Sequence, residues 1–87
     1  ALMHATKIMA NEFSSYNIRV NGICPNVTNT KMSKKMDLKS RNELISKSFM
    51  KKACEPNEVA NLILFLSSKN SKYINGQIIF LDGGMEC

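Results

Sequence analysis

Apolar residues recur at three- and four-residue intervals at the start of the chain. The apolar positions are Leu2, Ala5, Met9 and Phe13, with Ile8 alongside. This spacing predicts an amphipathic helix over residues 1–13, with the apolar stripe facing a core. No Ser, Thr, Asp or Asn precedes the first turn, so the pattern favours a helix that begins further upstream, as in a piece of a longer chain.

A strand is predicted next. Residues 18–24 alternate in character, with Ile18, Val20 and Cys24 on one face. Pro25 follows, and because proline has no backbone N–H, it ends the hydrogen-bonded ladder there. A polar loop with two threonines, residues 26–30, comes directly after it.

Residues 31–52 form the basic part of the chain. They contain eight lysine and arginine residues and two acidic residues, whereas the whole chain has a net charge of +5. Leu44, Ile45 and Phe49 give this stretch a narrow apolar stripe, which predicts one or two short helices laid over another part of the protein.

The last third of the sequence predicts a helix and a strand. Pro56 stands at a position suited to a first helical turn, and Glu58 follows near the positive end of the helix dipole. The expected buried stripe of this helix is Val59, Leu62, Ile63 and Leu66. The continuous apolar run at 77–81 predicts a strand covered on both faces, which ends at an Asp82-Gly83-Gly84 turn.

The order helix, strand, basic helical segment, helix, strand predicts an α/β fold. The long connection implies two parallel strands joined by a right-handed crossover. Two parallel strands need helices on both faces and neighbouring strands at their edges. We therefore expect these 87 residues to be part of a larger parallel sheet.

Composition narrows the class of protein. A hydrophobic content of 44% and only two prolines are typical of a folded globular chain, and no apolar run reaches the roughly 20 residues of a membrane span. No secretory signal is recognisable, and the three cysteines form no CxxC pair, which favours the cytoplasm or an organelle matrix. His4 has no second ligand at metal-binding spacing, so no metal site is expected.

Several short motifs occur together in one order. They are Ile18-Arg19-Val20-Asn21, Pro25, Thr30, Pro56-x-Glu58-Val59-Ala60, Phe65-Leu66-x-Ser68, Tyr73-Ile74-x-Gly76-Gln77 and Asp82-Gly83-Gly84. Together they resemble the C-terminal third of a short-chain dehydrogenase/reductase. The Gly83-Gly84-Met85 ending and the Thr30-x-Met32 pair are most similar to the 3-oxoacyl-acyl-carrier-protein reductase branch.

The resemblance implies a single Rossmann-type domain with a doubly wound parallel sheet, of which residues 1–87 would be the C-terminal part. It also implies hydride transfer between NADP or NAD and a carbonyl or alcohol, a role in fatty acid biosynthesis, and a homo-oligomer, expected to be a tetramer. The family's glycine-rich loop and Tyr-x-x-x-Lys group would lie upstream, since Tyr16 and Tyr73 have no lysine four residues later. We therefore expect no catalytic residue here and no activity from this chain alone.

By similarity, the cofactor-binding residues are Pro25, Asn26, Thr28 and Thr30. Pro25 would turn the chain, the backbone of Thr28 would contact the nicotinamide carboxamide, and the Thr30 hydroxyl would reach the same amide or a phosphate oxygen. The alternative from the residues alone is that the two threonines cap the next helix. Asn26 stands where the family usually has glycine, and asparagine tolerates a positive φ, so the turn is expected to survive.

Within the family, residues 31–52 correspond to a lid over the substrate. Phe49 replaces a usual proline, Lys52 a usual arginine and Asn75 a usual threonine, so the lid is expected to close in its own way. Its lysines suit an acidic acyl carrier protein or the phosphates of a coenzyme A thioester, while the alternative is a simple solvated face. Nucleic acid is not an expected partner, because no aromatic residues are interleaved with the charges.

A second hypothesis treats the chain as a non-catalytic truncated remnant. Such a chain would act as an interaction module, docking on a partner or a full-length relative through its sheet edge and helix faces. An upstream reading frame with the glycine loop and Tyr-x-x-x-Lys would favour the reductase over this alternative.

Overall fold

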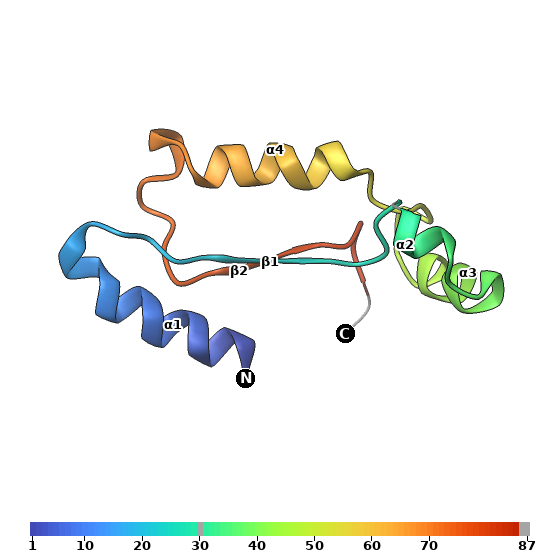
Figure 1. Ribbon diagram of the computed structural model, residues 1–87, viewed down its shortest axis with the longest axis horizontal. Helices are drawn as coiled ribbons and strands as arrows, with labels where there is room; N and C mark the ends of the chain where they lie inside the picture. The colour runs from blue at the N-terminus through green and yellow to red at the C-terminus, as the bar shows by residue number, and fades with distance from the viewer. Residues whose placement is uncertain (30, 86–87) are drawn as a thin grey trace. The chain divides into compact units, whose positions relative to one another are not determined.

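The computed structural model describes residues 1–29 and 31–85. Its helices and strands are α1 (Leu2–Phe13), η1 (Ser14–Tyr16), β1 (Gly22–Pro25), α2 (Lys31–Lys34), α3 (Leu38–Ser46), α4 (Pro56–Leu66), η2 (Lys69–Ser71) and β2 (Ile78–Leu81), as labelled in Figure 1. This confirms the predicted α/β order, including two short helices in the basic segment. None of the described helices has both the length and the apolar character needed to cross a membrane.

The sheet consists of β1 paired with β2. The N–H of Gly22 donates to the carbonyl of Gln77 (2.8 Å), and the N–H of Asn26 donates to the carbonyl of Leu81 (3.2 Å). The two bonds have the same sequence offset in the same direction, which is the register of parallel strands.

The first strand begins at Gly22, so the predicted start at Ile18 was wrong. The backbone of Val20 is occupied by the loop before β2: its N–H donates to the Asn75 side chain (2.9 Å), and its carbonyl accepts from Gly76 N–H (2.8 Å). The side-chain amide of Asn21 donates to the carbonyl of Ile74 (3.0 Å). These bonds hold residues 20 and 21 against residues 74–76, so the pairing between β1 and β2 does not extend to them.

The chain divides into two compact units, the first of which comprises residues 1–24 and 62–79. In this unit α1 buries the small residues Thr6 and Ala10, and Lys7 donates to the carbonyl of Gly76 (3.2 Å). The predicted apolar stripe is not buried in this chain, since Leu2 is 61% exposed and Met9 45%. Ala10 packs against Gly76, where a Cβ would lie 3.4 Å from the Ala10 Cβ, at ordinary contact distance.

Arg19 closes the C-terminal end of α4 in the same unit. Its guanidinium donates to the carbonyls of Leu66 (2.7 Å), Ile74 (3.1 Å) and Ser68 (3.4 Å). The last carbonyls of a helix have no partner within the helix, so a cation that donates to them satisfies both hydrogen bonding and the helix dipole.

The second unit comprises residues 25–61 and 80–87, described here as far as residue 85. Helix α3 begins at Asp37, whose carboxylate accepts from Ser40 N–H (3.3 Å). Within these 87 residues, Phe49 is 61% exposed beyond the end of α3, and Phe80 of β2 is 58% exposed. Helix α4 starts at Pro56 as predicted, but Ile63 of its predicted stripe is 49% exposed.

Candidate cofactor site

The candidate site is the loop that leaves β1. Pro25 is the exposed last residue of the strand, and the next residue, Asn26, still donates its N–H to β2 at Leu81. Val27 then turns inward and is only 6% exposed, which makes it one of the most buried apolar side chains of the described chain. This anchor holds the following residues, Thr28 and Asn29, beyond the carboxyl end of the strand, where open parallel sheets bind ligands.

The segment before α4 fixes this loop from one side. The N–H of Cys54 donates to the carbonyl of Val27 (2.8 Å), and the N–H of Asn29 donates to the carbonyl of Cys54 (2.7 Å), forming a parallel bridge between Thr28 and Cys54. The Asn29 side chain adds a bond to the Glu55 carboxylate (3.3 Å).

The hydrogen bonds of this bridge do not use the backbone N–H or carbonyl of Thr28. Its pairing bonds belong to the residues before and after it, and among the described residues no backbone hydrogen bond outside the helices and strands uses the N–H or the carbonyl of Thr28. Among the described residues, the backbone pairing of this loop thus leaves one donor and one acceptor of Thr28 unused.

Glu58 secures the start of α4. Its carboxylate accepts from the N–H of Glu55 (2.7 Å), which is the backbone half of a capping box. This hydrogen bond, followed by one from the Cys54 thiol, lowers the pKa of Glu58. The cap thus fixes the segment that holds the loop.

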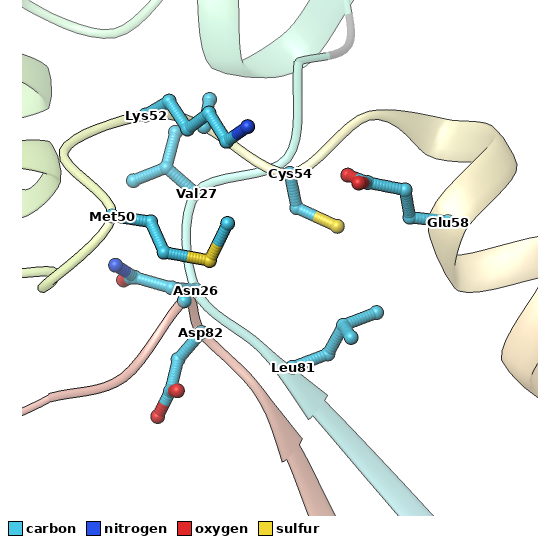
Figure 2. Close-up of a pocket in the computed structure, with 10 residues that line it drawn as sticks. Asn26, Val27, Met50, Lys52, Cys54, Glu58, Leu81 and Asp82 are labelled. Atoms are coloured by element: carbon cyan, nitrogen blue, oxygen red, sulfur yellow. The ribbon is translucent and has the colours of Figure 1, made fainter.

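A hollow of about 90 Å³ lies beside the loop (Figure 2). Its lining residues are Asn26, Val27, Met50, Lys52, Ala53, Cys54, Glu58, Leu81, Asp82 and Gly83. Figure 2 shows the Cys54 sulfur directed toward the Glu58 carboxylate. Burial, and then the hydrogen bond and negative charge of Glu58, raise the pKa of the Cys54 thiol, which disfavours the thiolate form.

Asn26 follows the strand with an ordinary backbone conformation. The non-glycine residues with positive φ among those described are Asn17 and Lys51, so the turn does not use the positive φ that asparagine tolerates. Its side chain has another role: the amide nitrogen lies 3.5 Å from the carbonyl of Leu44 and 3.7 Å from the sulfur of Met85.

The Asp82-Gly83-Gly84 turn lies next to the same loop. Asp82 accepts from the N–H of Gly84 (2.8 Å), and both glycines have positive φ, 67° and 84°. Both are also sterically required, because a Cβ on Gly83 would lie 2.8 Å from the Ser48 hydroxyl and one on Gly84 would collide with the Phe49 ring.

The structure brings together Pro25, Asn26 and Thr28 of the predicted site, while Thr30 lies outside the described residues. Sequence reasoning missed Cys54 and its contact with the loop. The capping pattern at Pro56 and Glu58 placed the helix start, but nothing in the sequence showed that the preceding residue pairs with Thr28. Among the described residues, no group of three or more His, Cys, Asp and Glu side chains is arranged to hold a metal ion.

Comparison with known proteins fits this geometry. A family model described as enoyl-(acyl carrier protein) reductase matches residues 1–86. The chain belongs to the short-chain dehydrogenase/reductase family. This confirms the resemblance drawn from the sequence motifs, and with it an α/β fold of the Rossmann type.

Individual relatives give the same assignment. The chain is 41% identical over 80 residues to a 3-oxoacyl-[acyl-carrier-protein] reductase of Thermotoga maritima, covering 92% of this chain and 32% of that protein. It is 39% identical over 87 residues to a tropinone reductase homolog of Arabidopsis thaliana, covering 98% of this chain and 28% of that protein. The chain therefore spans about a third of the length of these curated relatives.

Solved structures share the fold. The crystal structure of a 3-oxoacyl-[acyl-carrier protein] reductase from Brucella melitensis matches with a TM-score of 0.89 at 31% identity, covering 97% of this chain and 31% of that one. A short chain dehydrogenase family protein from Francisella tularensis matches with a TM-score of 0.82 at 26% identity, covering 94% of this chain and 38% of that one.

Proposed function

We propose that this chain forms the nicotinamide-facing wall and the substrate lid of an NAD(P)-dependent reductase. The whole protein would transfer a hydride from NADPH or NADH to the carbonyl of a 3-oxoacyl thioester. Family membership supports the oxidoreductase class, and the 41% identity to a 3-oxoacyl-[acyl-carrier-protein] reductase is the basis for proposing this substrate.

The backbone of Thr28 is the observation that carries the proposal. A carboxamide needs one donor and one acceptor, and Thr28 presents one N–H and one carbonyl that no other described backbone group uses. The two-sided anchorage of the loop, by buried Val27 and by the bridge to Cys54, holds these groups still. Such pre-organisation lowers the cost of orienting a bound ring.

The residues of this loop fit the cofactor, and their roles follow from their chemistry. The nicotinamide supplies the hydride when the cofactor is bound. Pro25 ends the strand, Asn26 follows it, and Thr28 would hold the carboxamide and so set which face of the ring is presented. The Thr30 hydroxyl is proposed to bind the same amide or a phosphate oxygen.

The basic segment 31–52 is proposed to cover the substrate. In the described structure, Lys39 on α3 is exposed, as are Lys47, Lys51 and Lys52 after it. Exposed cations attract an acidic acyl carrier protein or the phosphates of coenzyme A and accelerate encounter, an effect that salt screens. We expect the protein to act in the cytoplasm or an organelle matrix as a homo-oligomer, a tetramer by resemblance.

We propose further that residues 1–87 alone are inactive. The chain has no glycine-rich phosphate loop, and neither of its tyrosines is followed by a lysine at the fourth position. Its contribution would be binding and orientation, and the proton and hydride transfers would need the residues of the upstream part.

A proline substitution tests the role of Thr28 directly. Thr28→Pro removes the backbone N–H, whereas Thr28→Ala keeps it and removes only the side chain. In the full-length protein, we expect Thr28→Pro to weaken NADPH binding by about tenfold or more, because a charge-neutral donor is lost from a fixed site.

Fluorescence titration with NADPH measures this affinity. Thr28→Ala, the matched control, is expected to stay within about twofold of the natural protein. Equal affinities for the natural protein and a correctly folded Thr28→Pro variant would rule out the backbone contact.

A further inference from the structure

Two departures from the family pattern meet at one place in the structure. Asn26, where the family usually has glycine, lies beside Met85, and Phe49, where it usually has proline, bonds to Gly84. We propose that Asn26 and Phe49 are positioning residues that clasp the C-terminal residues 83–85 and thereby hold the end of the substrate lid in place. The clasp rests on the proposed lid function of residues 31–52.

Phe49 supplies a bond that proline cannot make. Its backbone N–H donates to the carbonyl of Gly84 at 2.7 Å, whereas proline has no N–H. The phenyl ring lies against Gly84, where even a Cβ would collide with it. Backbone and ring of one residue therefore both contact the same glycine.

The neighbouring residues extend this contact into a short antiparallel pairing. The N–H of Met50 donates to the carbonyl of Gly83 (3.1 Å), and Ser48 forms a bridge with Met85. Ser48 is completely buried, and its hydroxyl accepts from the N–H of Met50 (3.2 Å). The segment directly after α3 is thus fixed to the end of the chain.

Asn26 connects the cofactor loop to the contact between residues 48–50 and 83–85. Its amide nitrogen reaches the carbonyl of Leu44, in the last turn of α3, and the sulfur of Met85. At 3.5 and 3.7 Å these contacts are long, so each is weak, but both come from one side chain that glycine lacks. Asn26 therefore links three segments: the cofactor loop, the end of the lid helix and the chain end.

The clasp has a functional consequence. Because α3 is held at its C-terminal end by contacts that glycine at 26 and proline at 49 could not make, the lid should spend less time open than it would with those residues. A lid that stays closed retains the substrate, so loss of the clasp should raise the KM for the substrate.

Trypsin is a direct probe of lid opening, because the lid is rich in lysine and is cleaved only when its backbone leaves the closed position. The full-length protein and its Asn26→Gly and Phe49→Pro variants are digested under native conditions, and the cleavage rates after Lys39 and Lys47 are followed by mass spectrometry. We expect each variant to be cut about threefold faster at these positions, and the double variant faster still.

Two further variants keep the test decisive. Phe49→Ala retains the backbone N–H and removes the ring, so its rate of trypsin cleavage in the lid should lie between those of the natural protein and Phe49→Pro. This variant serves as the test if the proline variant folds poorly. Asn70→Gly makes the same chemical change as Asn26→Gly at an exposed residue outside the clasp, and it should leave cleavage in the lid unchanged.

Steady-state kinetics supply the second measurement. The clasp predicts a rise in KM for a 3-oxoacyl thioester in both Asn26→Gly and Phe49→Pro, with unchanged NADPH affinity in Phe49→Pro, which lies outside the proposed cofactor-binding residues. Lid cleavage rates equal to those of Asn70→Gly would overturn the clasp. A complete lack of reductase activity in the natural protein would instead refute the proposed function, while the trypsin rates would still decide whether the clasp exists.

Discussion

The thiol of Cys54 and the carboxylate of Glu58 are directed toward each other across the hollow beside Val27 (Figure 2). Burial raises the pKa of the thiol first, and the hydrogen bond and charge of Glu58 raise it further. The same bond helps to lower the pKa of Glu58. The pair thus disfavours the thiolate form of Cys54 next to the proposed cofactor loop.

The Glu58→Gln variant tests this pairing. Glutamine can still cap the start of α4, but it carries no charge, so the pKa of Cys54 should fall toward its ordinary value. Alkylation of Cys54 by iodoacetamide at pH 8 should then be about threefold faster, because only the thiolate reacts. Peptide-resolved mass spectrometry across a pH series measures this rate.

The pH profile separates the electrostatic effect from a general loosening. In Glu58→Gln the plot of Cys54 alkylation rate against pH should move to lower pH, and its plateau should not change. The control Glu12→Gln removes a charge on α1 and should leave this plot unmoved. A profile that rises at every pH without shifting would contradict the role given to Glu58.

Single residues also show the limits of sequence reasoning at this site. The role of Thr28 could be proposed only through the family resemblance, because from the residues alone the two threonines could also cap the next helix. The contacts of the Asn26 side chain could not be predicted, because its partners at Leu44 and Met85 are distant in sequence.

At the scale of elements, long periodic segments were predictable and strand limits were not. Helices α1 and α4 follow from their spacing and, for α4, from Pro56. The predicted start of β1 was wrong because side chains occupy the backbone before the strand. The Asn75 side chain binds the backbone of Val20, and the Asn21 side chain binds the backbone of Ile74 and Gln77. The apolar stripe of α1 is exposed within the described residues, which bury Thr6 and Ala10 of that helix.

Helix α3 depends on its N-cap at Asp37. The carboxylate accepts from Ser40 N–H and from the Ser40 hydroxyl, each at 3.3 Å. Asp37→Ala should destabilise the helix by about 1 kcal/mol, while Asp37→Asn, which also caps well, should change it little. Hydrogen exchange of residues 38–46 in the full-length protein should therefore speed up in the alanine variant.

The asparagine variant is the matched control for this measurement. Equal exchange in Asp37→Ala and the natural protein would show that α3 is held by its packing at Leu44 and Ile45 and that its cap contributes little.

At the scale of the whole molecule, the chain presents more apolar surface than an isolated domain normally does. Leu2, Ile8 and Leu64 are 61%, 46% and 68% exposed, and the buried apolar core of the described residues is limited to Ala10 and Val27. The two-stranded sheet also leaves surface uncovered, whereas parallel strands are stable when both faces and both edges are covered. The fold thus fits a chain that spans about a third of its relatives and completes its core with further residues.

The central claim is that this chain provides the nicotinamide wall of a 3-oxoacyl thioester reductase. The most direct test is to follow NADPH absorbance at 340 nm while the full-length protein is given a 3-oxoacyl thioester, with residues 1–87 alone assayed in parallel. We predict substrate-dependent oxidation of NADPH by the full-length protein and none by residues 1–87. Failure of the full-length protein to oxidise either NADPH or NADH with any 3-oxoacyl thioester would contradict the account and favour the interaction-module alternative.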